Sequence, residues 1–104
     1  MKTKFLLIAL AFGFYFSSAQ SVMINELDAD TPGVDLLEFI ELRTPNPFTP
    51  LDGYVVVLFN GSASGNDSSY YAKELNGLVT DINGLFVLGA QDLRPTPDYV
   101  IPLN

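Results

Sequence analysis

Residues 54–59 read Tyr-Val-Val-Val-Leu-Phe, and this stretch decides the fold class. β-branched and aromatic side chains dominate it, which suits the pleated, partly buried surface of a sheet. An Asp-Gly turn at residues 52–53 precedes the run, and Asn60-Gly61 follows it, so the run is bounded at the length of a strand. The sequence therefore predicts a strand at residues 54–59.

Further apolar runs of similar length lie on both sides of this strand. None is long enough for a typical helix, and no window keeps apolar residues at every third and fourth position. Turn sequences rich in Gly, Pro and Asn separate the runs by about 8 to 15 residues, a spacing that suits a sandwich or a barrel. The runs are residues 22–27, 36–42, 70–75, 85–88 and 99–103. We therefore expect an all-β fold.

The aromatic and branched residues of these runs predict a sandwich core. We assign the side chains of Tyr54, Val57, Phe59 and Phe86 to it. Consecutive residues of a strand face opposite sides, so the two tyrosines at residues 70–71 should place one ring inward and one at the surface.

Residues 1–19 have the three parts of a secretory signal peptide. Two lysines begin it, an apolar run covers residues 5–16, and small residues precede the cleavage point. The run is shorter than the roughly 20 apolar residues of a spanning helix, so a membrane anchor is the weaker interpretation. We expect a signal-peptide helix that is removed between Ala19 and Gln20, a secreted or cell-surface location, and one domain at residues 20–104.

The charge and composition exclude several classes of function. The chain has 12 acidic and 5 basic side chains, a formal charge of −7, and neither Cys nor His. It therefore has no disulfide, no thiolate or imidazole metal site and no Ser-His-Asp or Cys-His machinery. Loss of the two leader lysines would take the formal charge to −9, which disfavours binding to nucleic acid and to anionic membranes. We expect a protein or cell-surface partner, no direct nucleic-acid binding and no membrane span after cleavage.

Acidic residues are the candidates for a metal site. Glu26, Asp28 and Asp30 alternate along an expected strand and therefore share one face, and Asp35 follows the next turn. Carboxylate and carbonyl oxygens are the ligands that Ca²⁺ prefers, so these four residues predict a weak calcium site. In the alternative interpretation they form a solvated strand end, where Asp28 or Asp30 hydrogen-bonds the turn at residues 31–33.

Catalysis within this chain is not expected, and no catalytic residue or cofactor is assigned apart from the candidate calcium. Glu38 and Glu41 lie on opposite faces of the expected strand, and Glu26 is distant in sequence, which makes a glycosidase-type carboxylate pair a weak hypothesis. An 85-residue mature chain also needs most of its apolar side chains for a core. We interpret these acids as outward-facing, between inward-facing neighbours such as Phe39.

Four stretches, in this order, carry a resemblance to a known family. They are INELDADTPG at residues 24–33, EFIEL at residues 38–42, LDGYVVVLFNGS at residues 51–62 and DINGLFVLG at residues 81–89. Together they resemble the lamin-tail domain, an immunoglobulin-like sandwich that also occurs in secreted multidomain proteins. The resemblance spans nearly the whole mature chain and implies an immunoglobulin-like β-sandwich.

The same resemblance implies that the sandwich is incomplete. Members of this subtype usually continue past the region of residues 99–103 with another Asn-Gly turn and a further strand, whereas this sequence ends at Asn104. A sandwich that lacks a strand exposes unpaired backbone groups and an apolar face, which favours self-association by strand exchange.

Three functions follow as expectations. The first is a secreted, non-catalytic lamin-tail-like binding or spacer module that acts through exposed loops or sheet edges. The alternative is the N-terminal part of a secreted endonuclease/exonuclease/phosphatase-like hydrolase, whose catalytic domain would lie downstream of Asn104. A third is a calcium-stabilised assembly protein that accepts a strand from another chain.

Overall fold

The computed structural model describes residues 22–29, 36–66 and 68–102, and this part of the chain contains six strands and no helix. The strands are β1 (Met23–Asp28), β2 (Phe39–Arg43), β3 (Val55–Phe59), β4 (Ser69–Glu74), β5 (Leu85–Gly89) and β6 (Tyr99–Val100). The all-β prediction is confirmed. Among the described residues no helix has the length and apolar character needed to cross a membrane. The expected signal-peptide helix and its cleavage point between Ala19 and Gln20 lie outside the described residues.

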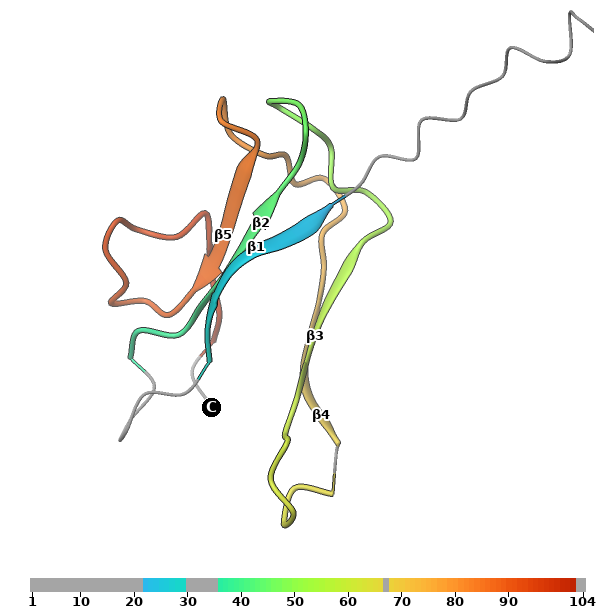
Figure 1. The fold of residues 1–104 in the computed structure, drawn as a ribbon, viewed down its shortest axis with the longest axis vertical. Coiled ribbons are helices and arrows are strands. Elements are labelled where there is room, and N and C mark those ends of the chain that lie inside the picture. Colours follow the sequence, from blue (N-terminus) through green and yellow to red (C-terminus); the bar gives the residue numbers. More distant parts are fainter. Residues whose placement is uncertain (1–21, 30–35, 67, 103–104) are drawn as a thin grey trace, which may run out of the picture.

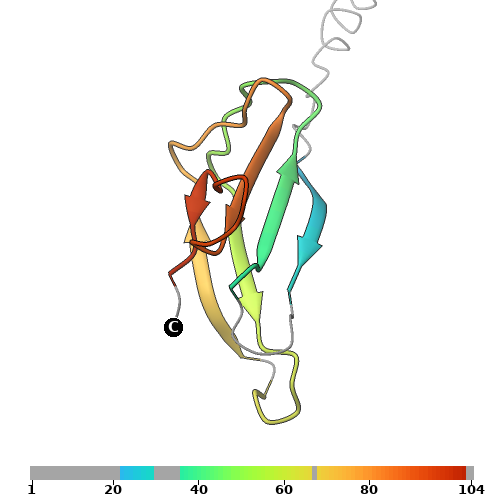
Figure 2. The same ribbon diagram turned by 90° about the vertical axis from the view of Figure 1, so that its left-hand side faces the viewer.

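The strands form two sheets, an arrangement consistent with a β-sandwich. One sheet has four strands in the order β1-β2-β5-β6, and the other contains β3 and β4 (Figure 1). β1, β2 and β5 pair antiparallel, β6 pairs parallel to β5, and β3 pairs antiparallel to β4. Seen from the side, the β3-β4 hairpin lies behind the larger sheet (Figure 2).

The core lies between these sheets. β2 contributes Ile40 and Leu42, and β5 contributes Phe86 and Leu88. The connections add Leu51, before β3, and Leu75, after β4, and both are fully buried. Because β2 and β5 are the two central strands of the larger sheet, their inward residues receive cover from neighbours on both sides.

Two of the residues predicted to be in the core, Val57 and Phe59, lie on the outer face of their strand. Phe86 is buried and Tyr54 packs against the core, as expected, but Val57 is 39% and Phe59 is 64% exposed. The inward residues of β3 are instead Val56 and Leu58. The stretch is apolar at every position, so its pattern does not distinguish the two faces, and tertiary packing decides between them.

Alternation along β2 corrects a third prediction. Ile40 and Leu42 face the core, so Phe39 lies on the outer face together with Glu41, not inward as expected. On β4, Tyr70 is exposed and Tyr71 is half-buried, as expected, although Tyr70 also borders a small pocket together with Ile40 and Leu58.

Buried threonines hold one end of the fold together. The Oγ1 of Thr80 accepts the backbone N–H of Thr49 at 2.8 Å and lies 3.2 Å from the Oγ1 of Thr44. The backbone N–H of Thr44 donates to the carbonyl of Gly84 at 2.8 Å. In a chain without cysteine, these bonds join the β2-β3 connection to the turn before β5 and satisfy polar groups that burial would otherwise leave unpaired.

The turn before β5 is organised by one carboxylate. Asp81 Oδ1 accepts the backbone N–H groups of Leu85 at 2.9 Å and Asn83 at 2.8 Å. These hydrogen bonds, led by the one from Leu85, hold the pKa of Asp81 below its usual range because they stabilise the charged form. The Asn-Gly turn therefore has a side-chain anchor in addition to its glycine.

Candidate functional site: an open apolar groove between the sheets

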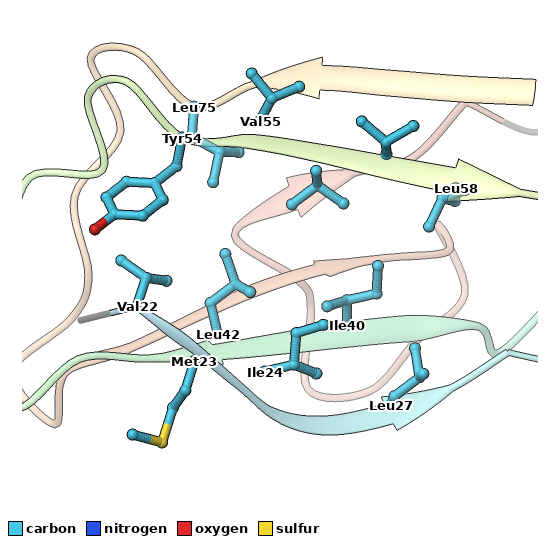
Figure 3. A pocket seen from close by; sticks show the side chains of 12 residues that line it. Val22, Met23, Ile24, Leu27, Ile40, Leu42, Tyr54, Val55, Leu58 and Leu75 are labelled. Carbon is cyan, nitrogen blue, oxygen red and sulfur yellow. The ribbon is translucent and has the colours of Figure 1, made fainter. Parts of the chain in front are cut away.

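A groove of about 460 Å³ opens between the two sheets on the side of β1 and β3. Inward side chains of β1 and β2 form one wall, and β3 with its flanking residues forms the other (Figure 3). Ile24, Ile40 and Leu42 point into the space from one side and Leu58 from the other, whereas Met23 and Val55 point away from it. The complete lining is Val22, Met23, Ile24, Leu27, Ile40, Leu42, Tyr54, Val55, Val56, Val57, Leu58 and Leu75.

The groove is open because β1 lacks a strand opposite it. Ile24 and Leu27 lie on the inner face of β1 and are nevertheless 64% and 55% exposed. In the described part of the chain the larger sheet has four strands and the smaller one has two, and the inner residues of β2 and β5 are buried whereas those of β1 are not. Apolar side chains aimed into the space between two sheets and left in water indicate a surface that is suited to a partner.

A bulge in β1 explains why Ile24 and Leu27 share a face although they are three residues apart. The register of β1 with β2 shifts between Ile24 and Glu26, so that Ile24 pairs with Leu42 and Leu27 pairs with Ile40. An inserted residue of this kind changes the simple alternation of a strand. The sequence pattern alone shows no sign of it.

The edge of β3 next to the groove has free backbone groups. The carbonyl of Tyr54 accepts the N–H of Leu75 at 3.0 Å, and the N–H of Asn60 donates to Ser68 at 2.9 Å, so the even-numbered residues direct their backbone groups toward β4. Alternate residues of an antiparallel strand point their backbone groups to opposite sides. Val55, Val57 and Phe59 therefore present N–H and C=O groups to the side where no described strand pairs with β3.

Polar and aromatic side chains occupy the side of the sandwich next to β4 and β6. Lys73 Nζ lies 4.4 Å from the centre of the Tyr99 ring, which is cation-π geometry. Burial raises the pKa of Tyr71 to about 12, and its hydrogen bond with Tyr99 and the proximity of that phenol act in the same direction. These contacts link β4 to β6 across the two sheets, whereas on the opposite side, next to β1 and β3, the sheets are separated by the open groove.

The raised pKa of Tyr71 predicts a loss of stability in alkali. Folding disfavours the phenolate, so the contribution of Tyr71 is complete below its ordinary pKa of 10.0 and is lost as the pH rises through about 12. We expect the melting temperature to fall between pH 10 and pH 12, and to fall less in Tyr71→Phe than in the wild type. Tyr70→Phe, on the same strand but exposed, is the matched control. An equal fall in melting temperature for Tyr71→Phe and the wild type would contradict the assignment of this alkaline loss of stability to Tyr71.

Two of the acidic candidates, Glu26 and Asp28, lie on the outer face of the larger sheet, away from the groove. Glu26 pairs with Glu41 across β1 and β2, and Asp28 pairs with Phe39, so Glu26 and Asp28 share one face as expected. Asn25 Nδ2 donates to Glu41 Oε1 at 2.6 Å and so engages one of these carboxylates.

The structure does not test the full calcium prediction. No group of three or more acidic side chains in the described ranges is close enough to hold a metal ion. Of the four predicted ligands, Glu26 and Asp28 are described, whereas Asp30 and Asp35 lie outside the described residues. The calcium site at these four residues therefore remains a prediction.

The groove residues were missed as a site by sequence reasoning, although one signal pointed to them. A strand that is apolar at every position is typical of strands covered on both faces, and β3 reads Val-Val-Val-Leu-Phe. The described part of the chain covers only one face of β3 and pairs only one of its edges. The contrast between this uniformly apolar sequence and its partial cover marks β3 as a strand with one uncovered face and one unpaired edge.

The fold and the groove define the described part of the chain as a two-sheet, all-β domain with an open apolar groove along one side. Comparison with models of known protein families, with curated proteins and with solved structures finds no match to this chain.

Proposed function

We propose that this chain is a secreted, non-catalytic binding or spacer module of the lamin-tail type, with an immunoglobulin-like sandwich, and that it binds an extended polypeptide in the groove between β1 and β3. The observation that carries the proposal is the combination of an apolar groove with the free backbone edge of β3 along its wall. A polypeptide in extended conformation uses both, because its side chains enter the groove and its main chain pairs with β3.

The composition of the groove supports binding more than chemistry. Its lining contains no carboxylate, amine, amide or aliphatic hydroxyl, and the phenol of Tyr54 is its one polar side-chain group. General acid-base and nucleophilic catalysis both need positioned ionisable groups, which this lining does not supply. Binding here would depend on burial of apolar surface and on main-chain hydrogen bonds.

The lamin-tail part of the proposal rests on the four sequence stretches and on where they fall. The stretches at residues 24–33, 38–42, 51–62 and 81–89 include most of β1, β2, β3 and β5, respectively. The last two also contain the glycine turns that lead into β3 and β5. The resemblance thus follows the strand-and-turn framework of the domain, and it is independent of the groove.

A peptide that is able to add a strand tests the binding role. The probe is a short peptide of alternating Val and Thr with Lys at each end. It is titrated into a dilute solution of the protein, which is expressed from Met1. We expect the intact mass of the secreted protein to correspond to the chain without residues 1–19. We expect binding with shifts of the Leu27 and Leu58 methyl signals in NMR spectra. Ile24→Lys should weaken binding at least about tenfold, because it places a charge in the apolar wall.

Ile82→Lys is the matched control for this titration. Ile82 is 69% exposed, close to the 64% of Ile24, but it lies in the turn before β5 and not in the groove. The substitution makes the same change of charge, so it corrects for the attraction between an acidic protein and a basic peptide. Equal affinity of the two variants, or no binding to the wild type, would refute the proposed role of the groove.

A further inference from the structure

We propose that the occupant of the β3 edge is β3 of a second copy of this chain, paired antiparallel about a two-fold axis that passes through Val57. The pairing joins the two small sheets into one sheet with the order β4-β3-β3-β4. This inference rests on the proposed binding role of the groove and deepens it by naming the partner.

The chemistry of the edge favours a partner with the same composition. β3 carries no charged side chain, and its outer face presents Val55, Val57 and Phe59 to solvent. Natural edge strands are usually protected from pairing by charged residues, proline or bulges that face the free side. β1, which forms the corresponding edge of the larger sheet, carries Glu26 and Asp28, whereas β3 lacks such protection on its free side.

The backbone of β3 is complementary to itself in this register. Val57 faces Val57 of the second copy, and Val55 faces Phe59 of the second copy, so each pair joins residues whose N–H and C=O groups both point to the free edge. Antiparallel residues of this kind exchange two hydrogen bonds, which gives about six across the three pairs. Two of these pairs also place a β-branched side chain beside an aromatic ring, a favourable cross-strand combination.

The two-fold arrangement also provides cover for both grooves. An axis perpendicular to the small sheet keeps the inner faces of the two β3 strands on the same side of the joined sheet. The open groove of each copy then faces that of the other, so Ile24 and Leu27 of both copies lie along one continuous apolar interior. Burial of such side chains is the main favourable term in association.

The distribution of charge favours contact at this strand over other parts of the surface. The chain has a net charge of −7, so two copies repel each other wherever their acidic surfaces approach. β3 is uncharged, and the paired glutamates Glu26 and Glu41 lie on the outer face of the larger sheet. Added salt screens the remaining repulsion and should therefore strengthen the dimer.

Sedimentation and cross-linking of the full chain, expressed from Met1, test this proposal. We expect an average mass that rises with concentration toward that of a dimer, and a dissociation constant that Val57→Lys raises at least about tenfold. Ile82→Lys, with the same change of charge in an exposed turn, should leave it unchanged.

A single cysteine gives a more local readout, because the chain has none of its own. The proposed register puts the two Val57 Cα atoms about 5.5 Å apart, within the range that a disulfide spans. Oxidation of Val57→Cys should give the disulfide-linked dimer quantitatively at low concentration, whereas Ile82→Cys should form little intermolecular disulfide. This conservative variant keeps the test valid if Val57→Lys fails to fold. The amide protons of Val55, Val57 and Phe59 should exchange more slowly in the dimer than in the monomer.

The outcomes separate this inference from the proposed function. A dimer that is insensitive to Val57→Lys, with no cross-link at residue 57, overturns the β3 interface. A strict monomer that binds the Val-Thr peptide in a manner dependent on Ile24 overturns the second copy as the partner and leaves the groove as a binding site. A strict monomer that does not bind the peptide overturns both.

Discussion

Leu88→Ala is expected to lower the free energy of unfolding by about 2 to 5 kcal/mol, a large share of the roughly 5 to 15 kcal/mol that stabilises a typical domain. Leu88 is fully buried on the inner face of β5, the central strand that pairs with both β2 and β6. Its removal leaves a cavity that neighbours on all sides cannot fill without moving. Urea unfolding followed by circular dichroism measures the loss.

Leu27→Ala is the matched control for this substitution. Leu27 is the same residue type on the inner face of the same sheet, but it lies in the open groove and is 55% exposed. We expect a loss of less than about 1 kcal/mol, measured at a dilution where copies of the chain are separate. A loss as large as that of Leu88→Ala would mean that the groove is closed in solution.

Gly84→Ala is expected to have the second large effect on stability. Gly84 adopts a positive φ of 75°, a region that costs an L-residue roughly 1 to 2 kcal/mol. A Cβ at this position would also lie 2.6 Å from the backbone oxygen of Thr44, which belongs to the buried threonine network. Backbone strain and steric clash therefore add, and the clash disturbs the connection between the end of β2 and the turn before β5.

Gly77→Ala separates the two effects. Gly77 has nearly the same φ of 78°, but a Cβ there meets no atom within 4 Å. We expect a loss of about 1 to 2 kcal/mol for Gly77→Ala and a larger loss for Gly84→Ala, with thermal melting as the measurement. Equal losses would show that the contact with Thr44 relaxes without cost, and that strain in φ accounts for the whole effect.

The positions of the strands followed well from the sequence because they depend on local chemistry. Each apolar run lies between Gly, Pro, Asn or Asp residues that favour turns, and the described strands start or end within a few residues of the predicted runs. The Asn-Gly turn at residues 83–84 is an example, since it needs both the positive φ of Gly84 and the side-chain acceptor of Asp81.

The sequence predicted less accurately which face of each strand points to the core. The period of two in β2 was recognised, but the assignment of Phe39 to the inside was wrong because Ile40 and Leu42 occupy the inner face instead. In β3 every residue is apolar, so Val57 and Phe59 were assigned to the core while Val56 and Leu58 pack there. A uniform stretch gives no information about its orientation, and long-range packing supplies that information.

The sequence by itself determined that the described part of this chain is all-β, that the chain is acidic and without cysteine or histidine, and that Val-Val-Val-Leu-Phe forms a strand, because these properties are local or compositional. Tertiary structure alone decided that the free edge of this strand borders a groove beside β1, and that Ile24 and Leu27 face into it across a bulge. The physical reason is that strand neighbours and uncovered faces depend on pairing between residues distant in the chain, and a pattern of single residues does not record which partner is absent.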